Sequence, residues 1–307
     1  MTDRRPQLDN LTPYASVPEQ LLQSYHRHLR ASQKRPSTID LYLYIVKRFA
    51  AYCGEQGFPP LGELRREHVE AWIVSLADAG RSGNTQRDYA IWLRQWFVWL
   101  LEEGEVRANP MERVKLPAGE ETEKDVVAPA AMLAALDALR KAKNWRDLAI
   151  LELLYDTGMR VGECSRAVQD DLDFDARTLR LRAATTKGKR ERVVALSDRC
   201  IADLDRYLRK RTDSHPELFV GRQGPLTRAG IYRVVRLAFP DAGATIGPHD
   251  IRHTSASHIS ASISEADMLT LFGWKNSKEA RRYTKQAAQA NAIAAHRQAS
   301  PLERLGR

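Results

Sequence analysis

Apolar residues recur at helical spacing through most of the first hundred positions of the chain. The pattern predicts four amphipathic helices, over residues 19–32, 38–57, 66–80 and 84–104, with Ser37 as the N-cap of the second. Four tryptophans fall within these helices, and we expect them to pack in a core rather than stack on bases, namely Trp72, Trp92, Trp96 and Trp99. Residues 1–17 have prolines and little periodicity, so a flexible arm is predicted before a helical domain over 18–116.

The second part of the chain follows a segment that is rich in charge and has no hydrophobic face. This segment predicts a linker over 117–127 and a larger domain over 128–307. In the larger domain, helical periodicity covers 129–143, 144–158, 198–211 and 227–239, and residues 171–197 alternate as short strands do, with a KGK turn. The predicted fold is therefore mainly α, with a small antiparallel β-sheet in the second domain.

Composition adds an expectation about the partner. The chain has 307 residues, 48 Lys plus Arg against 39 Asp plus Glu, and a formal net charge of +9. Such a balance favours a polyanion, nucleic acid first, although on charge alone an ordinary basic protein is an equal alternative. We expect an intracellular protein, because no apolar run is long enough for an anchor and none follows the N-terminal charges. Cys53, Cys164 and Cys200 do not have the spacing of a metal-binding motif, so we expect buried, reduced thiols.

The candidate chemistry gathers near the C-terminal end. His249 and Arg252 lie three positions apart on a helix opened by Pro248, so they share one helix face. Tyr283 follows after a second apolar run. Arginine can grip a phosphate through two parallel hydrogen bonds, and histidine exchanges a proton near neutral pH. Together with a hydroxyl nucleophile, these side chains indicate phosphoryl chemistry.

The order of six residues along the chain is a stronger signal than any one of them. They are Arg160 in TGMRVGE, Lys187 in TKGKRERVVAL, His249 and Arg252 in PHDIRHT, Trp274 in LFGW, and Tyr283 in ARRYTK. In this order they resemble the tyrosine recombinase family, also called the phage-type integrases, and the resemblance covers residues 18–283. It implies a helical, SAM-like core-binding domain and a catalytic domain with a C-terminal exchange tail, which close around duplex DNA as a C-shaped clamp.

The resemblance also implies a role for each residue. Tyr283 would attack a scissile phosphate and leave a 3′-phosphotyrosyl link with a free 5′-hydroxyl. Arg160 and Arg252 would hold the non-bridging oxygens, since a delocalised charge and a fixed donor fork suit a pentacoordinate phosphorane. His249 would assist proton transfer, and Glu163, one turn after Arg160, would orient a catalytic group, with an ordinary surface carboxylate as the alternative.

Four features of the chain need separate comment. Lys187 stands where the family places its general acid, although Lys189 is a close competitor. Trp274 replaces the histidine of most members; indole can donate a hydrogen bond and pack, but it cannot shuttle a proton. The segment before Trp274 is about one residue short near 262–264, and Ala195 replaces a usual proline.

No metal or nucleotide is expected, because each transesterification exchanges one phosphodiester for another. The chain has no GxxxxGK[ST] loop, and among His249, His253 and His258 the nearby Arg252 would oppose a cation. His253 and His258 are therefore predicted to be structural. The tail over 284–298 has a weakly apolar face, and it either docks on a neighbouring protomer or frays.

The predicted function is site-specific DNA recombination through a Holliday junction, in the manner of simple Xer-like or Cre-like members. The expected partners are double-stranded DNA with specific sites and a homo-tetramer, with or without a second recombinase, and no membrane. The expected location is the cytoplasm, at the nucleoid. Two alternatives remain: a catalytically decayed DNA-binding accessory factor, and a type IB topoisomerase-like enzyme.

Overall fold

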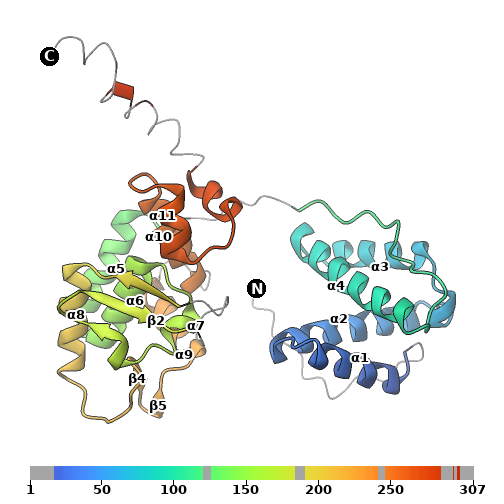
Figure 1. The fold of residues 1–307 in the computed structure, drawn as a ribbon, viewed down its shortest axis with the longest axis horizontal. Coiled ribbons are helices and arrows are strands. Elements are labelled where there is room, and N and C mark those ends of the chain that lie inside the picture. Colours follow the sequence, from blue (N-terminus) through green and yellow to red (C-terminus); the bar gives the residue numbers. More distant parts are fainter. Residues whose placement is uncertain are drawn as a thin grey trace. The chain divides into compact units, whose positions relative to one another are not determined.

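A computed structural model of the chain describes residues 17–119, 126–183, 191–240, 246–284, 293, 296 and 297 (Figure 1). The chain divides into two compact units, Met1–Thr122 and Glu123–Arg307. Helices dominate both units. In the described part of the second unit, a three-stranded and a two-stranded antiparallel sheet accompany the helices. The prediction of a mainly α fold with a small antiparallel sheet is confirmed.

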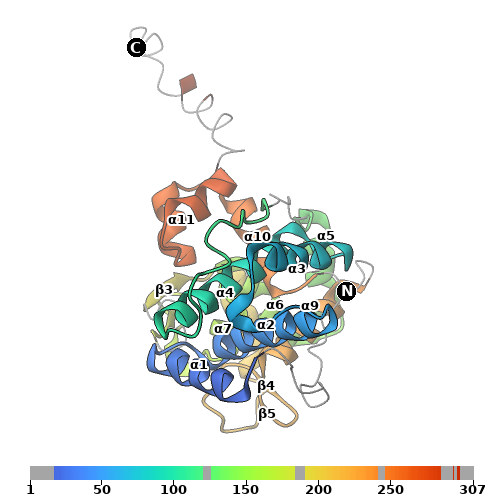
Figure 2. The same ribbon diagram turned by 90° about the vertical axis from the view of Figure 1, so that its right-hand side faces the viewer.

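The first unit is a set of four α-helices with a shared apolar core. These are α1 (Glu19–Ala31), α2 (Pro36–Glu55), α3 (Arg66–Asp78) and α4 (Gly83–Glu102), with a 3₁₀ turn η2 (Leu61–Glu63) before α3. Helices α2 and α4 pack side by side, as Figures 1 and 2 both show. Trp72, Trp96 and Trp99 are at most 3% exposed, and Trp92 packs against the same core. The expectation that these indoles serve packing is confirmed.

Two boundaries of the first unit differ from the sequence prediction. Helix α2 begins at Pro36 with Arg35 as its N-cap, so Ser37 lies inside the first turn and caps nothing. Proline suits the first helical position because its fixed φ matches the helix and its missing N–H would have no intrahelical partner there. Val17, which the sequence assigned to the arm, is 4% exposed and belongs to the core.

The second unit surrounds one central helix. Its helices are α5 (Pro129–Lys141), α6 (Trp145–Thr157), α7 (Val161–Cys164), α8 (Asp198–Leu208), α9 (Arg228–Ala238), α10 (Pro248–Ile259) and α11 (Glu265–Phe272). Residues 277–284 are also helical, and a 3₁₀ turn, η3 (Gln169–Asp171), precedes the first strand. Every residue of 147–154 is buried, and α5, α8, α9 and α10 all pack on α6. A helix buried on all sides is the expected centre of such a unit.

The three-stranded sheet contains the two strands that flank the predicted KGK turn. It consists of β1 (Leu172–Asp173), β2 (Thr178–Leu181) and β3 (Arg192–Ala195), in the order β1-β2-β3. Strands β2 and β3 are antiparallel, with Leu181 opposite Arg192. Residues 184–190, including Lys187 and Lys189, lie outside the described residues. A second hairpin, β4 (Val220–Gly221) with β5 (Gly224–Pro225), was not predicted, because two-residue strands leave no alternating pattern to detect.

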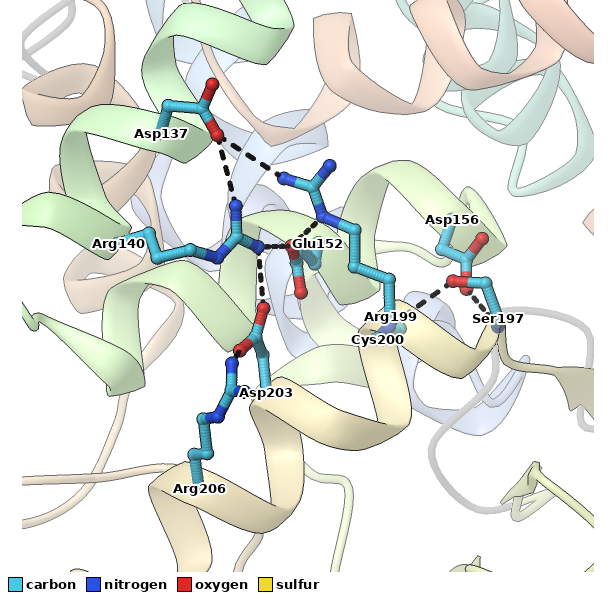
Figure 3. A network of polar contacts seen from close by, with 9 residues as sticks. All are labelled: Asp137, Arg140, Glu152, Asp156, Ser197, Arg199, Cys200, Asp203 and Arg206. Atoms are coloured by element: carbon cyan, nitrogen blue, oxygen red, sulfur yellow. Dashed lines mark hydrogen bonds and ion pairs between the residues drawn. The ribbon is translucent and has the colours of Figure 1, made fainter.

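A network of charged side chains joins α5, α6 and α8 (Figure 3). Arg140 of α5 donates to Glu152 of α6 at 2.8 Å and to Asp203 of α8 at 2.7 Å. Arg199 donates to the same oxygen of Glu152, Oε1, at 2.8 Å. Glu152 and Asp203 are buried, at 4% and 1% exposed. The packing of three helices around α6 therefore depends on paired charges as well as on apolar contacts.

Several further expectations about the second unit can be compared with the structure. Cys53, Cys164 and Cys200 are free and buried, as predicted. Val127, assigned to the linker, is instead 7% exposed in the core of this unit, and its amide donates to Thr254 Oγ1 of α10 at 3.1 Å. Among the described residues, no helix is both long and apolar enough to cross a membrane.

Candidate active site

A left-handed turn after α6 positions Arg160. The helix ends at Thr157, and Gly158 follows with φ +56° as its C-cap. A Cβ at this position would overlap the ring of Phe272, so glycine is required both by the backbone angle and by the close approach. The turn leads into the fully buried Met159 and then to Arg160, the N-cap of α7. The side chain of Arg160 remains 30% exposed, which leaves it open to a ligand.

Glu163 lies one turn later and is almost fully buried. Its carboxylate accepts the Arg160 amide at 2.9 Å and Arg160 Nη1 at 3.3 Å. It also accepts two hydrogen bonds from Arg192, at 3.2 and 2.8 Å. Burial raises the pKa of Glu163, but the hydrogen bonds and charge of Arg192 and Arg160 outweigh burial and hold that pKa below its usual value. Glu163 is therefore an ionised group beneath Arg160 rather than a surface carboxylate.

Arg252 of α10 is held by backbone carbonyls. Its Nη1 donates to the Gly158 carbonyl at 2.5 Å, and its Nη2 donates to the Phe272 carbonyl at 2.8 Å. The guanidinium also lies 5.2 Å from the ring centroid of Phe272 and 5.6 Å from that of Trp274. Burial, together with the positive charges of Arg160 and Arg192, lowers the pKa of Arg252 to about 9. An anion beside this side chain would favour its charged form.

Tyr283 completes a stack of aromatic rings that begins in α11. Phe272 stacks on Trp274 at 4.7 Å, and Trp274 stacks on Tyr283 at 5.3 Å with only 6° between the planes. His253 meets the Tyr283 ring edge-on at 5.1 Å. Burial raises the pKa of Tyr283, and the charge of Arg252 opposes this in part. The phenol is thus protonated at neutral pH and lies in a positive environment.

The histidines occupy different places. His249 is exposed in the first turn of α10, one turn before the buried Arg252. His258, near the other end of α10, has its Nδ1 2.7 Å from the hydroxyl of Tyr155 on α6. Within the described ranges, no group of three or more His, Cys, Asp or Glu side chains is arranged to hold a metal ion. The positive groups here are arranged for an anion instead.

The structure thus brings together five of the predicted residues: Arg160, Glu163, Arg252, Trp274 and Tyr283. They come from segments that are far apart in the sequence and meet beside α10 and α11. Arg160 and Arg192 both bind the carboxylate of Glu163, and Arg252 lies close enough for the charges of all three to affect its pKa. This excess of positive charge, next to a hydroxyl group, is suited to a phosphodiester.

Sequence reasoning missed Arg192, although a signal was present. Arg192 shares a sheet face with the buried Val194 and stands opposite the buried Leu181, so it occupies an inward-facing position of its strand. A charged residue at such a position predicts a buried partner of opposite charge. That partner is Glu163.

Comparison with known protein families covers both units of the chain. The model of the phage integrase family matches residues 125–290, and that of the N-terminal SAM-like domain of phage integrases matches residues 21–104. The chain therefore belongs to the phage integrase family, that of the tyrosine recombinases.

Relatives and solved structures extend the match along both units. Over 235 residues the chain is 29% identical to the tyrosine recombinase XerD of Staphylococcus haemolyticus, and the aligned region covers 73% of this chain and 78% of the relative. Over 278 residues it is 27% identical to the tyrosine recombinase XerA of Pyrococcus horikoshii, with 88% and 90% covered.

Among solved structures, the Tn1549 transposon integrase in complex with transposon right end DNA has a TM-score of 0.72 at 17% identity, covering 90% of this chain and 99% of that one. A lambda integrase dimer bound to a COC′ core site has a TM-score of 0.70 at 18% identity, covering 86% and 76%. At such identities the similarity is one of fold.

Proposed function

We propose that this protein is a site-specific recombinase that cuts and rejoins duplex DNA through a 3′-phosphotyrosyl intermediate and a Holliday junction. One observation carries the proposal: Tyr283 stacks on Trp274, whose indole ring also contacts the guanidinium of Arg252. A nucleophile and a phosphate-binding side chain are thus held by one chain, within one set of contacts. Family membership supports the same function.

The reaction can be followed atom by atom. The hydroxyl oxygen of Tyr283 forms a bond to phosphorus while the bond from phosphorus to the 5′-oxygen breaks. Burial raises the pKa of Tyr283, so the phenol carries a proton that must be removed during the attack. His249 is the group proposed to assist this transfer. Lys187 is proposed to protonate the leaving 5′-oxygen, an assignment that rests on the family pattern. Ligation is the same reaction in reverse, with a 5′-hydroxyl of the partner strand.

The charges around the phosphate are stabilised by the guanidinium groups. Arg160 is partly exposed and braced by Glu163, so its fork can bind a non-bridging oxygen without losing its orientation. Arg252 holds two backbone carbonyls and keeps its remaining N–H groups for the phosphate. Trp274 is proposed to donate its indole N–H to a phosphate oxygen and to support the Tyr283 ring. The charge that develops on the phosphorane meets donors that are already in place.

The proposed partner is duplex DNA that carries specific sites, bound by a tetramer across two of them. The formal charge of +9 favours such a polyanion. A fold neighbour, the lambda integrase, has been solved as a tetramer bound to a Holliday junction, with a TM-score of 0.68 at 18% identity over 85% of this chain and 78% of that one. The proposed location is the cytoplasm, at the nucleoid, where such a DNA substrate would be found. No metal or nucleotide enters the proposed reaction, because the phosphotyrosine stores the bond energy.

Covalent trapping tests the proposal directly. Nicked duplexes drawn from the flanks of the gene are incubated with the protein in EDTA, and the denatured products are searched for protein linked to DNA. We expect an adduct with the wild type and none with Tyr283→Phe. Tyr232→Phe is the matched control, since Tyr232 is a 40% exposed tyrosine of the same unit, and it should form as much adduct as the wild type.

The other outcomes separate the alternatives. If Tyr283→Phe still forms the adduct, the nucleophile is misassigned. If the wild type binds the duplex tightly and in a salt-sensitive way but forms no adduct, the protein is an accessory factor. If it forms the adduct and relaxes supercoiled plasmid as a monomer on any sequence, it is topoisomerase-like.

A further inference from the structure

Arg192 is a half-buried arginine for which the proposed reaction has no role so far. It is the first residue of β3, and its side chain is only 10% exposed. Its Nη1 and Nη2 donate to the two oxygens of Glu163 at 3.2 and 2.8 Å, and its Nε donates to the Leu271 carbonyl at 3.1 Å. All three guanidinium nitrogens are therefore engaged within the protein. Arg192 is equipped to hold other groups rather than to bind a phosphate.

These contacts link Arg160, which is proposed to bind the phosphate, to the C-terminal end of α11, which leads to Trp274. Glu163 accepts Arg192 on one side and the amide and Nη1 of Arg160 on the other. A carboxylate gripped by a bidentate guanidinium has one orientation, so the hydrogen bond that it offers Arg160 has a fixed direction. The position of Arg160 therefore depends on Arg192, although the two side chains lie on different elements.

The other end of the chain of contacts lies at the C-terminus of α11. Arg192 binds the carbonyl of Leu271, and Arg252 binds the carbonyl of the next residue, Phe272. Gly273 follows with φ +60°, and a Cβ there would lie 3.0 Å from Nη1 of Arg192. The backbone that leads to Trp274 is thus packed directly against the guanidinium of Arg192.

We propose that Arg192 is a positioning residue for DNA cleavage. It holds Glu163, and through Glu163 the phosphate-binding Arg160, in a fixed position relative to the end of α11. The inference rests on the function proposed above. It assigns Arg192 no contact with DNA. It predicts that loss of the guanidinium fork disturbs catalysis far more than it disturbs DNA binding.

Single-turnover cleavage of the trapped duplex measures the effect. Arg192→Gln loses the charge and the fork, and Arg192→Lys keeps the charge but loses the two-pronged grip on Glu163. We expect both to cleave on the order of 10²-fold more slowly than the wild type, the cost of a misplaced catalytic group. The dissociation constant for the duplex should stay within about twofold, because Arg192 donates only to protein groups.

Arg180→Gln is the matched control. Arg180 lies on the neighbouring strand β2 and pairs with the buried Asp171 at 2.8 Å, so it repeats the arginine-carboxylate arrangement away from the site. This variant should cleave at the wild-type rate. If Arg180→Gln is as slow as Arg192→Gln, the effect comes from loss of sheet structure and the proposal is wrong.

A neutral substrate shows whether the defect passes through Arg160. Replacing a non-bridging oxygen of the scissile phosphate by methyl removes the negative charge that Arg160 is proposed to neutralise. On this methylphosphonate, the deficit of Arg192→Gln relative to the wild type should shrink by at least about tenfold, in parallel with Arg160→Ala. A purely structural defect would remain equally large on both substrates, and that result would overturn the proposal.

Failure of this inference can be told apart from failure of the proposed function. If the wild type forms no covalent adduct, the proposed function fails. If the wild type forms the adduct and both Arg192 variants cleave at its rate, only the positioning role fails. Should Arg192→Gln not fold, Arg192→Lys carries the same two comparisons, because it retains the positive charge opposite Glu163.

Discussion

The buried carboxylate of Glu152 makes the stability of the second unit depend on pH (Figure 3). Burial, followed by the charge of Asp203, raises the pKa of Glu152 from 4.5 to about 7, while Arg199 opposes the shift. Arg140 faces the same carboxylate from α5. Glu152 is therefore partly protonated at neutral pH, in spite of two arginines that donate to it.

The sign of the effect follows from proton linkage. A carboxyl group whose pKa is higher in the folded state contributes stability that is complete below its unfolded pKa, and that stability is lost as pH rises through the folded value. For Glu152 the window runs from pH 4.5 to about 7. Asp203 acts in the opposite sense and elsewhere: burial raises its pKa, but hydrogen bonds from Arg140 and Arg206 lower it below 3.8. The two groups therefore affect stability in separate pH ranges.

Glu152→Gln removes this titration with little change of shape. The amide oxygen can still accept from Arg140 and Arg199, and the amide nitrogen can donate to Asp203, with which Glu152 already interacts. At ~1.4 kcal/mol for each pH unit, the part of this interval between pH 5 and about 7 corresponds to ~3 kcal/mol. Between pH 5 and pH 8, the free energy of unfolding of the variant should therefore gain ~3 kcal/mol relative to that of the wild type.

Hydrogen exchange of α6 amides, corrected for the intrinsic exchange rate at each pH, measures this free energy for the second unit alone. Asp137→Asn is the control, because Asp137 is 59% exposed and contacts the same two arginines. Its stability should follow that of the wild type across the pH range. Parallel curves for Glu152→Gln and the wild type from pH 5 to pH 8 would refute the reasoning, since Glu152 would then be ionised throughout.

Two other substitutions test the supports of the site. Gly158→Ala should lower the free energy of unfolding by more than the ~1 kcal/mol of its left-handed backbone, because the new methyl group also displaces Phe272; Gly104→Ala, with φ +76° and open space around it, should show the backbone cost alone. Equal destabilisation in urea unfolding would contradict this. Thr254→Val removes the acceptor of the buried Val127 amide and should cost ~1–3 kcal/mol in the same assay, and an unchanged midpoint would show that this hydrogen bond contributes nothing.

The helices and the site residues were predictable because their signals are local. Each helix carries its own apolar periodicity, and each site residue stands in a short segment with characteristic neighbours. Arg160, Arg252, Trp274 and Tyr283 were predicted in this way, and the structure brings their side chains together. The boundary at Val127 was missed for a related reason: a single valine has no periodicity, and its burial depends on a helix more than one hundred residues later.

The contacts that orient the site are not local, and that is why they escaped prediction. Arg192 and Glu163 are 29 positions apart and meet only when β3 packs against α7 and the end of α11. The acceptors of Arg252 are the carbonyls of Gly158 and Phe272, and every residue has such a carbonyl. Only the path of the backbone decides which carbonyl faces which arginine.

The charge of the site shows which constraint governs it. Arg160 and Arg192 bind the carboxylate of Glu163, whereas Arg252 donates to two backbone carbonyls. Burial, and then the charges of Arg160 and Arg192, lower the pKa of Arg252 to about 9. Such an excess of like charge is unfavourable in the free protein, and it becomes favourable once a phosphate enters. The proposed phosphate ligand therefore explains the cluster better than the stability of the fold does. Reasoning from phosphate chemistry identified Arg252, and the family motif identified Arg160, whereas Arg192 was found only in the structure.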